Sequence, residues 1–425
     1  MASGTRVIYS ALWGMNNPQL TSTSNSTPVR PLATAGASRW VVPLLVLALG
    51  SFAMGTDSFV LAGILPQLDS GLHISLGSAG QVVTAFALTY AVSAPFLAVA
   101  TGKVSRKALM TVALTLFVVA NLAAAAAPTL PLLLVARIAA AVGAALFTPT
   151  ASAAAVALAS PARRGQALSI ILGGLAVGTV FGVPAGTAIG QHLGWQASLL
   201  FVAAVALVAL VGLLVTLPAL PTPPAVSMKQ RLALLVNRRV LLIVAVTTVA
   251  TGSGILVYTY IAQILASTAH LTGTGLALAL LVWGVGGTLG TFGSGWLTDR
   301  YGANRTLLLA IAGLGLALLG LGYAGNPAVV LPLMAVYGAA GWAVATPNNH
   351  RLTALAPTLP SVVISFNSSG IYLGQALGAV TGGLLLAHDS SAITLCVIAA
   401  AAAGATLCLQ IMSIREIRGG VATSK

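Results

Sequence analysis

The amino-acid sequence predicts an all-α membrane protein with twelve transmembrane helices in two six-helix halves, and three observations support this fold class. The first is composition, because 58% of the 425 residues are hydrophobic and 6% are charged, whereas soluble domains carry roughly a quarter charged residues. The second is a series of twelve long apolar runs. The third is the distribution of the basic residues along the chain.

Each apolar run is long enough to cross the hydrocarbon core of a bilayer, which needs about 20 mostly apolar residues. The runs are interrupted by Gly, Pro or charged residues. The first six lie near residues 41–66, 76–101, 107–128, 130–158, 166–191 and 197–219. After a basic, Pro-containing stretch, the other six lie near residues 240–264, 273–298, 306–324, 327–349, 361–386 and 392–413.

The basic residues predict the orientation of these helices. If the N-terminus is inside, eighteen of the 19 Lys and Arg residues fall on one side of the membrane and none on the other, while Arg137 alone lies within a helix. Cytoplasmic loops accumulate Lys and Arg, so both termini are expected in the cytoplasm, with the protein in the inner (plasma) membrane. The net charge of +14 is then a topology signal, and no nucleic-acid partner is expected.

The chain divides into five predicted segments. They are a disordered cytoplasmic tail (1–40), a first six-helix half (41–219), a cytoplasmic connector (220–238), a second six-helix half (239–413) and a cytoplasmic tail (414–425). The near-equal halves, each with a basic loop after its second helix, indicate an internal repeat. Secondary transporters are often built from such repeats, with the substrate site at their interface. The alternative is that any strongly apolar chain looks self-similar.

Asp57 is the one acidic residue predicted to lie within a membrane helix. Asp69 and Asp389 fall in external loops, whereas Asp299 and Glu416 fall at cytoplasmic edges. A carboxyl group in hydrocarbon is costly, and by default it marks a substrate or proton pathway. The alternative is a kink in the first helix, stabilised by contacts from the Asp57 side chain to freed backbone groups.

Arg137 is expected at the same depth as Asp57. Asp57 lies about nine residues before the outer end of its helix, near Pro66, and Arg137 about seven residues after the start of its own. At 1.5 Å per residue, both lie roughly 10–14 Å below the outer surface. Equal depth makes an ion pair possible, and we expect the two residues to couple protons. The alternative is that Arg137 extends to the outer interface as an anchor.

The fifth predicted helix has a regular series of glycines. Every fourth position is glycine at Gly174, Gly178, Gly182, Gly186 and Gly190. This spacing places them on one face, where the backbone of a neighbouring helix can approach closely. Pro184 interrupts the series and is expected to bend the helix at that contact.

Several polar and aromatic residues are candidates for lining a cavity for a small-molecule substrate. They are Gln81, Thr84, Tyr90, Asn121, Tyr258, Tyr260, Trp283, Asn367, Tyr372 and Gln375. Packing between helices is the alternative for each. A mainly apolar site with few polar groups suits amphiphilic compounds. The histidines fall in or beside loops, and HExxH, G-x-S-x-G and Walker A motifs are absent from the sequence. We therefore expect neither an enzyme nor an ATP-driven pump, and no metal or cofactor.

Four stretches of sequence carry a family resemblance. The first helix contains FAMGTDSFVLAGILPQL, the fourth LLVARIAAAVGAALF, the fifth GGLAVGTVFGVPAGTAIGQHLGW, and the loop after the eighth reads GWLTDRYGANR. Together they resemble the major facilitator superfamily, and specifically the chloramphenicol- and sugar-efflux branch of its twelve-span drug:proton antiporters. The resemblance implies a monomeric, proton-coupled exporter of small amphiphilic compounds, such as chloramphenicol, that works by alternating access.

The resemblance also implies roles for particular residues. The glycine series of the fifth helix, with Pro184, corresponds to the family's antiporter motif, which limits leak and sets the direction of exchange. Asp299, with Arg300 and Arg305, would form a charged cytoplasmic gate. Two positions depart from the family pattern: Ser58 stands where many relatives have Glu, and Gly102 stands where the loop motif after the second helix has Asp.

Two alternative functions remain open at this stage. The first is a sugar or metabolite exporter of the same superfamily, although sugar sites usually need more buried hydrogen-bonding groups than these helices offer. The second is a membrane receptor that shares the fold and does not transport. A receptor predicts that Asp57 is dispensable and that a cytoplasmic surface binds a dedicated partner.

Overall fold

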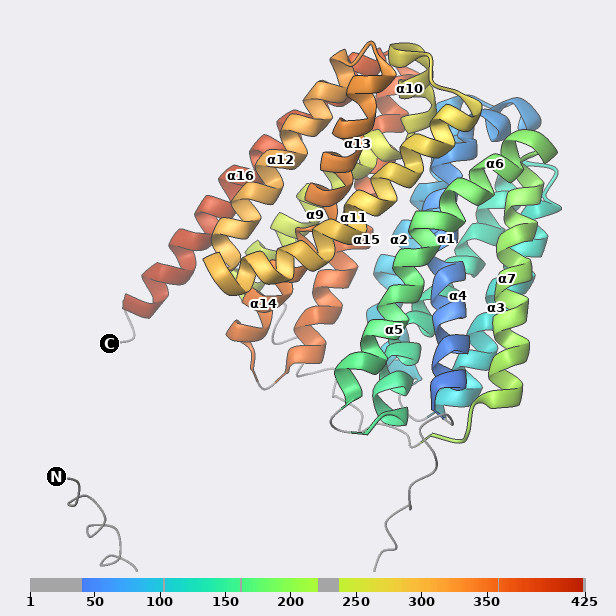
Figure 1. The fold of residues 1–425 in the computed structure, drawn as a ribbon, viewed down its shortest axis with the longest axis vertical. Helices are drawn as coiled ribbons and strands as arrows, with labels where there is room; N and C mark the ends of the chain where they lie inside the picture. Colours follow the sequence, from blue (N-terminus) through green and yellow to red (C-terminus); the bar gives the residue numbers. More distant parts are fainter. Residues whose placement is uncertain (1–39, 102–103, 161–162, 221–236, 358, 423–425) are drawn as a thin grey trace, which may run out of the picture. The chain divides into compact units, whose positions relative to one another are not determined.

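In the computed structural model of the chain, all the secondary structure of the described residues is helical (Figure 1). These residues are 40–101, 104–160, 163–220, 237–357 and 359–422. Twelve of the helical stretches have the length and apolar composition to cross a membrane, which confirms the predicted fold class. Almost all of the predicted N-terminal tail (1–40) and of the connector (220–238) lies outside the described residues.

The first six spans are formed by eight helical segments. They are α1 (Val41–Leu72), α2 (Leu76–Ala100), α3 (Arg106–Ala125), α4 (Leu130–Leu158), α5 (Arg164–Val177), the π-helical η2 (Gly178–Gly182), α6 (Val183–Leu193) and α7 (Trp195–Thr216). Segments α5, η2 and α6 together make the fifth span.

The second six spans are also formed by eight segments. They are α9 (Arg238–Thr259), α10 (Ile261–Ala269), α11 (Gly273–Tyr301), α12 (Ala303–Tyr323), α13 (Pro327–Trp342), α14 (Ala345–Leu355), α15 (Pro360–Ala387) and α16 (Ala392–Ala422). Segments α13 and α14 together make the tenth span. Large apolar side chains, among them Phe181, Leu289 and Leu316, are exposed on the helices, as a surface that faces lipid requires.

Several helix ends differ from the sequence prediction. The tenth span ends at Leu355 instead of 349, and α16 continues to Ala422, through most of the predicted cytoplasmic tail (414–425). Helix α1 continues past Pro66 to Leu72, because a proline removes one backbone hydrogen bond and need not end a helix. It stops where His73 adopts a left-handed conformation and donates its N–H to the carbonyl oxygen of Asp69. The predicted span 240–264 is divided at Tyr260, whose backbone is not helical and whose hydroxyl donates to the carbonyl oxygen of Ala379, 2.9 Å away.

The fifth span packs against α1 through its glycines. Gly174, Gly178, Gly182, Gly186 and Gly190 lie against Ala48, Phe52, Thr56, Val60 and Ile64, respectively. Both series advance by four residues in the same direction, so the two helices run side by side through five successive contacts. A Cβ atom at any of these glycines would collide with α1. Just before Pro184 the chain forms the π-helical turn η2, in which the Val183 N–H donates to the carbonyl oxygen of Gly178.

The second half contains a glycine series of the same kind. Gly370, Gly374, Gly378 and Gly382 on α15 lie against Val244, Thr248, Gly252 and Leu256 on α9. In both halves, each glycine follows the residue that it contacts by the same number of positions, 126 (174 and 48; 370 and 244). The repeat suggested by the sequence is therefore present in the packing of the eleventh span on the seventh.

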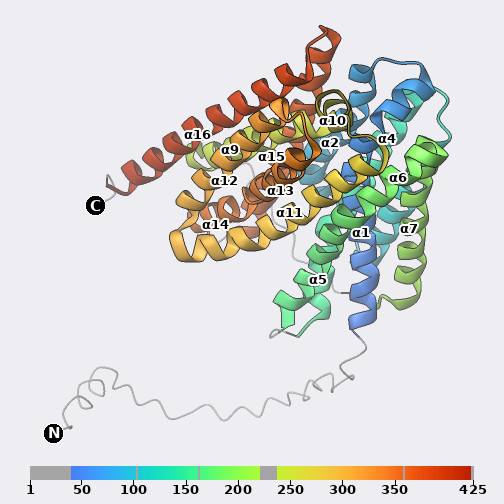
Figure 2. The same ribbon diagram turned by 45° about the horizontal axis from the view of Figure 1, so that its top comes forward.

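The two halves contact each other mainly through two pairs of elements. Helix α2 packs against α15, and α11 packs against η2 and α6. At one end of the first pair, Gly77 lies against the backbone of Gly383, and on α11 Gly284 lies against the backbone of Val180. In Figures 1 and 2, the helices of the two halves meet near α10 and diverge toward the end of the structure where α1 begins.

Candidate functional site

Asp57 and Arg137 form a buried ion pair between α1 and α4. The guanidinium donates two hydrogen bonds to the carboxylate, from Nη1 to Oδ1 at 2.8 Å and from Nη2 to Oδ2 at 3.0 Å. The side chains of Arg137 and Asp57 are 1% and 0% exposed, and the guanidinium lies over the ring of Phe86 on α2, 4.6 Å from its centre. Such a bidentate contact is the strongest form of an arginine–carboxylate interaction. The structure thus joins the two groups that the sequence places at equal depth.

The packing of the fifth-span glycines on α1 positions the α1 backbone next to the Asp57–Arg137 ion pair. Thr56, which precedes Asp57, packs on Gly182. Its hydroxyl oxygen lies 2.9 Å from the carbonyl oxygen of Phe52 in α1 and 3.2 Å from that of Gly178 in the fifth span, and its one hydrogen is shared between these two acceptors. The π-helical turn of η2 falls at the same level. The height of the carboxylate along α1 therefore depends on the packing of the fifth span.

The equivalent position in the second half is occupied by a hydroxyl group. Ser253 follows the α9 residue that packs on Gly378, as Asp57 follows the α1 residue that packs on Gly182. Ser253 is buried, and its Oγ donates to the carbonyl oxygen of Ala250 at 2.8 Å. A serine has no ionisable carboxyl group, so the two halves differ in chemistry at matched places in the repeat.

Two tyrosines connect the ion pair with the other half of the molecule. Tyr90 on α2 and Tyr372 on α15 stack with their ring centres 3.5 Å apart and their planes at 21°. Tyr372 packs against the hydrophobic core of the first half, where it approaches Ser58 and the charge of Asp57. The ion pair therefore lies next to the contact between the halves, and Ser58, the residue after Asp57, lies close to a tyrosine of the second half.

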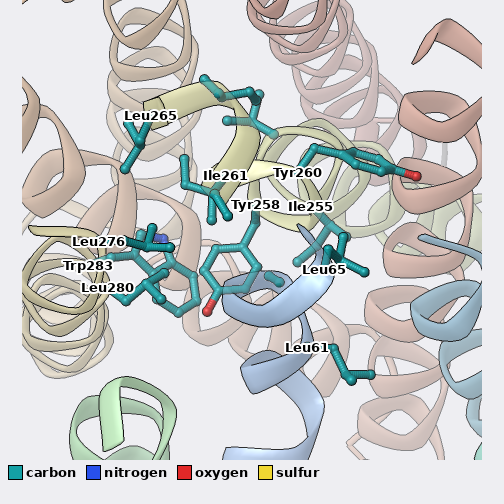
Figure 3. Packing of buried hydrophobic residues seen from close by; sticks show 14 of the residues in the cluster. Leu61, Leu65, Ile255, Tyr258, Tyr260, Ile261, Leu265, Leu276, Leu280 and Trp283 are labelled. Carbon is teal, nitrogen blue, oxygen red and sulfur yellow. The ribbon is translucent and has the colours of Figure 1, made fainter. Parts of the chain in front are cut away.

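Aromatic residues from both halves cluster around Phe59 of α1. Phe59 of α1 lies with its ring centre 5.5 Å from that of Tyr258, 5.4 Å from that of Trp283 and 5.7 Å from that of Trp342. Figure 3 shows the ring of Tyr258 beside the indole of Trp283, with centres 4.2 Å apart. The indole Nε1 of Trp283 is buried and has no hydrogen-bond partner among the described residues. Tyr258 and Trp283, both predicted to line a cavity, therefore lie side by side.

Two other cavity candidates lie elsewhere. Gln81 is half-buried on α2, with its Nε2 close to Gly383 of α15 at the contact between the halves. Asn121 is buried within the first half, where its Nδ2 donates to the carbonyl oxygen of Phe117 at 3.0 Å. Its Oδ1 and the Nε of Arg137 are both buried without a partner in the described part of the chain.

Asn367 belongs to a polar network inside the second half. Its Oδ1 accepts a hydrogen bond from Thr247 at 2.6 Å, and its Nδ2 donates to Asn349 Oδ1 at 2.8 Å. Thr247 in turn accepts from Asn348 at 2.8 Å. Gln375 is buried on the same helix, α15. Asn367 is therefore fully engaged with neighbouring helices in this conformation.

The predicted gate residues lie at the end of α11 and the start of α12. Asp299, Arg300 and Arg305 are all exposed, and no ion pair within 4.0 Å joins them in the described ranges. Arg300 instead lies over the rings of Trp296 and Tyr301, at 5.4 and 5.6 Å. The gate role remains a prediction.

Two features go beyond the sequence predictions. The glycine series on α15 has the same four-residue period as the one on the fifth span, so its spacing is a usable signal. Arg351 reads in the sequence as a topology signal, yet it is 7% exposed and donates to Asn348, Gln410 and Ser413 at 3.2, 2.7 and 2.6 Å. Asn348 lies one turn before Arg351 on α14, but no local pattern marks Gln410 and Ser413, because they come from α16.

A membrane protein of two repeated six-helix halves, with a buried ion pair beside their interface, has the organisation of a secondary transporter. The sequence matches the family model of the Major Facilitator Superfamily over residues 47–379. The chain belongs to this superfamily and is therefore a multi-pass membrane transport protein.

Relatives with known names cover most of the chain. It is 31% identical to the inner membrane transport protein YdhP of Escherichia coli O157:H7, over 88% of this chain and 96% of that protein. It is 31% identical to the chloramphenicol resistance protein of Streptomyces lividans, over 82% of this chain and 90% of that protein. Identity to the uncharacterized MFS-type transporter YbcL of Bacillus subtilis (strain 168) is 32%, over 82% of this chain and 90% of that protein.

Solved structures share the fold at low sequence identity. A mutant of the nucleoside transporter NupG superimposes with a TM-score of 0.72 at 13% identity, covering 88% of this chain and 99% of that one. The D-xylose-proton symporter superimposes with a TM-score of 0.71 at 16% identity, covering 88% of this chain and 97% of that one. At these identities the likeness establishes the fold and carries no information on substrate.

Proposed function

We propose that this protein exports small amphiphilic compounds, with chloramphenicol-type antibiotics first among them, in exchange for protons. The observation that carries this proposal is the buried Asp57–Arg137 pair beside the contact between the halves. A carboxylate in a membrane interior marks an ion or proton pathway. The resemblance to the chloramphenicol resistance protein supports the substrate class.

The proton step would consist of making and breaking this pair. With both termini in the cytoplasm, the contact of Gly77 with Gly383 lies on the outer side, so the present conformation is closed to the outside. In this conformation Asp57 is held as a carboxylate by the two N–H groups of Arg137. A proton that enters from the outside in the other conformation would neutralise the carboxylate and remove the charge that the arginine binds. Release of that proton inward would restore the pair.

Tyr372 would transmit this change to the second half. It lies near Asp57 and stacks on Tyr90 across the contact between α2 and α15. Protonation of Asp57 changes the charge that faces the tyrosine, and hence the relative stability of the two conformations. A proton can shift the equilibrium only through such a difference between states.

The substrate would bind at the aromatic cluster of Phe59, Tyr258 and Trp283. Stacked and edge-on rings favour a planar, apolar group. The buried Trp283 Nε1, which has no partner among the described residues, offers one hydrogen-bond donor for a substrate oxygen. Since Phe59 is two residues from Asp57 on α1, substrate and proton would affect the same stretch of helix, which is how their competition would arise.

Asp299, Arg300 and Arg305 would close the cytoplasmic side in the outward-open conformation. Their exposure and their lack of ion pairs in the described ranges suit a conformation in which that side is open. The glycine series of the fifth span would hold the α1 backbone rigidly enough to limit leak. We further propose that the protein works as a monomer.

The test is substrate-induced proton movement in proteoliposomes that contain a pH-sensitive dye. Wild type would be compared with Asp57→Asn and with the control Asp389→Asn, which removes an exposed acid at φ 54, a conformation that Asn tolerates. The panel is chloramphenicol, cationic dyes and simple sugars. We expect chloramphenicol to drive proton movement in wild type and in the control, and not in Asp57→Asn.

Other outcomes would redirect the proposal. If Asp57→Asn couples as well as wild type, the proton role of Asp57 is wrong. If sugars move protons and chloramphenicol does not, the chain is a sugar exporter. If no compound on the panel moves protons, the metabolite exporter and the receptor become the better accounts.

A further inference from the structure

A pocket of about 540 Å³ lies at one end of the second half, between the turn from α11 to α12 and the end of α14. It is lined by Tyr301, Gly302, Ala303, Asn304, Arg305, His350, Arg351, Ala354 and Leu355. It is far along the chain from Asp57 and shares no residue with the aromatic cluster. Arg305 is the one lining residue that also belongs to the proposed cytoplasmic gate, and neither the gate nor the comparisons account for the rest of the pocket.

The lining of this pocket is basic. Arg305, His350 and Arg351 contribute to it, and none of the lining residues is acidic. All five acidic side chains of the chain are in the described ranges, and the two ion pairs found there do not include Arg351. Asp299, two residues before the lining residue Tyr301, is exposed on α11.

Arg351 is a buried cation with uncharged partners. It is 7% exposed, and its three hydrogen bonds go to the side-chain oxygens of Asn348, Gln410 and Ser413. An arginine has five N–H donors, so these three acceptors do not use all of them. A buried charge without a counter-charge is costly, and an anion in the pocket would supply that counter-charge.

The backbone of the pocket suits an anion as well. Gly302 has φ 86, and the turn that it makes allows α12, a helix of 21 residues, to begin at Ala303. The first residues of α12 line the pocket, and the free N–H groups of a helix N-terminus favour negative charge. Asn304 accepts from Gln410 at 3.4 Å, so the same glutamine contacts this turn and Arg351.

We propose that this pocket binds a phosphate group. Arginine matches phosphate oxygens in geometry and charge, and of the two arginines that line the pocket Arg305 is exposed and Arg351 is buried. The phosphate has two possible carriers: the headgroup of an anionic phospholipid in the adjacent leaflet, or a soluble phosphate. Exposed Tyr301 and the apolar side chains of Ala354 and Leu355 at the rim suit either carrier.

The test measures the unfolding temperature of the full-length protein in nanodiscs. One arm compares phosphatidylcholine alone with phosphatidylcholine containing phosphatidylglycerol. The other adds sodium phosphate to phosphatidylcholine nanodiscs, against sodium chloride at matched ionic strength. Each arm uses wild type, Arg305→Gln and the control Arg415→Gln, which changes an exposed arginine of α16 outside the pocket. Arg305 is chosen because it is exposed, so its loss spares the network of Arg351.

We expect one ligand to raise the unfolding temperature of wild type and of Arg415→Gln, and Arg305→Gln to need at least about tenfold more of it, since a hydrogen bond to a charged group is lost. A response to phosphatidylglycerol alone assigns the site to a lipid headgroup, and a response to phosphate assigns it to a soluble anion. If neither ligand stabilises wild type, or if Arg305→Gln responds as wild type does, the proposal is wrong.

Discussion

In each half, a glycine series packs one span against another in the same way. The side chain next to this glycine contact differs between the halves. Asp57 follows the α1 residue that packs on Gly182, and Ser253 follows the α9 residue that packs on Gly378. The packing frame is repeated, because close helix contacts need small residues in both halves. The ionisable group is not repeated, so the proton chemistry that we propose at this level is confined to the first half.

The two halves also differ at their buried arginines, which do not occupy matched places in the repeat. Arg137 of the first half meets a carboxylate, whereas Arg351 of the second half meets amides and a hydroxyl. A charge pair can be made and broken by one proton, while a network of neutral acceptors cannot. The two halves of a repeated fold can thus have different roles. We propose proton exchange for the first half, whereas Arg351 holds helices of the second half together.

The largest expected effect comes from breaking the charge pair. Arg137→Met leaves the Asp57 carboxylate buried and unpaired, which costs about 3–5 kcal/mol of folding free energy. The double variant Asp57→Asn/Arg137→Met removes both charges and should recover much of that loss. Chemical unfolding in detergent measures the folding free energy of the single and the double variant. Equal destabilisation of the single and double variants would show that the pair is not ionised in the folded protein.

Removal of the buried arginine of the second half should cost less. Arg351→Met removes a cation whose partners are neutral, so what remains is unpaired amide and hydroxyl oxygens, at about 1–3 kcal/mol. Chemical unfolding of Arg351→Met and Arg137→Met under the same conditions compares the two losses of folding free energy directly. A loss as large as that of Arg137→Met would mean that a counter-charge stabilises Arg351 and that the halves are more alike than described.

The glycine series allow a matched test of packing against coupling. Gly178→Ala and Gly374→Ala each place a Cβ against a backbone carbonyl, that of Phe52 and that of Thr248, respectively. Both should destabilise by about 1–3 kcal/mol through overpacking. Only Gly178→Ala shifts the helix that carries Asp57, so we expect it alone to reduce drug-driven proton movement in proteoliposomes. Equal loss of coupling in both variants would contradict this division.

The smallest expected effect concerns the aromatic cluster. Trp283→Phe keeps a ring and removes the unpaired Nε1 donor, and losing one neutral hydrogen bond to a substrate costs about 0.5–1.5 kcal/mol. Chloramphenicol binding should weaken about three- to tenfold, with proton release per bound drug unchanged. Tryptophan fluorescence of the remaining indoles or equilibrium dialysis measures the affinity. Unchanged affinity would remove Trp283 from the substrate site.

Much of the fold is predictable, because span length, basic loops and glycine spacing are local signals. The equal depth of Asp57 and Arg137 also follows from counting residues along two helices. The approach of Tyr372 to Asp57 does not, because it depends on how α15 crosses α2. The network of Arg351 escapes prediction for the same reason: its partners Gln410 and Ser413 are about sixty residues away in sequence.

The most direct test of the central claim is infrared difference spectroscopy of the protonated carboxyl band when chloramphenicol binds to the purified protein. The protein is held at a pH acidic enough to protonate Asp57 and open its ion pair before the drug is added. If Asp57 exchanges its proton for the drug, the protonated carboxyl signal should then decrease on binding in wild type and in Asp389→Asn, and this change should be absent from Asp57→Asn. If the same signal change persists in Asp57→Asn, the proton resides elsewhere, and the assignment of proton coupling to the Asp57–Arg137 pair is wrong.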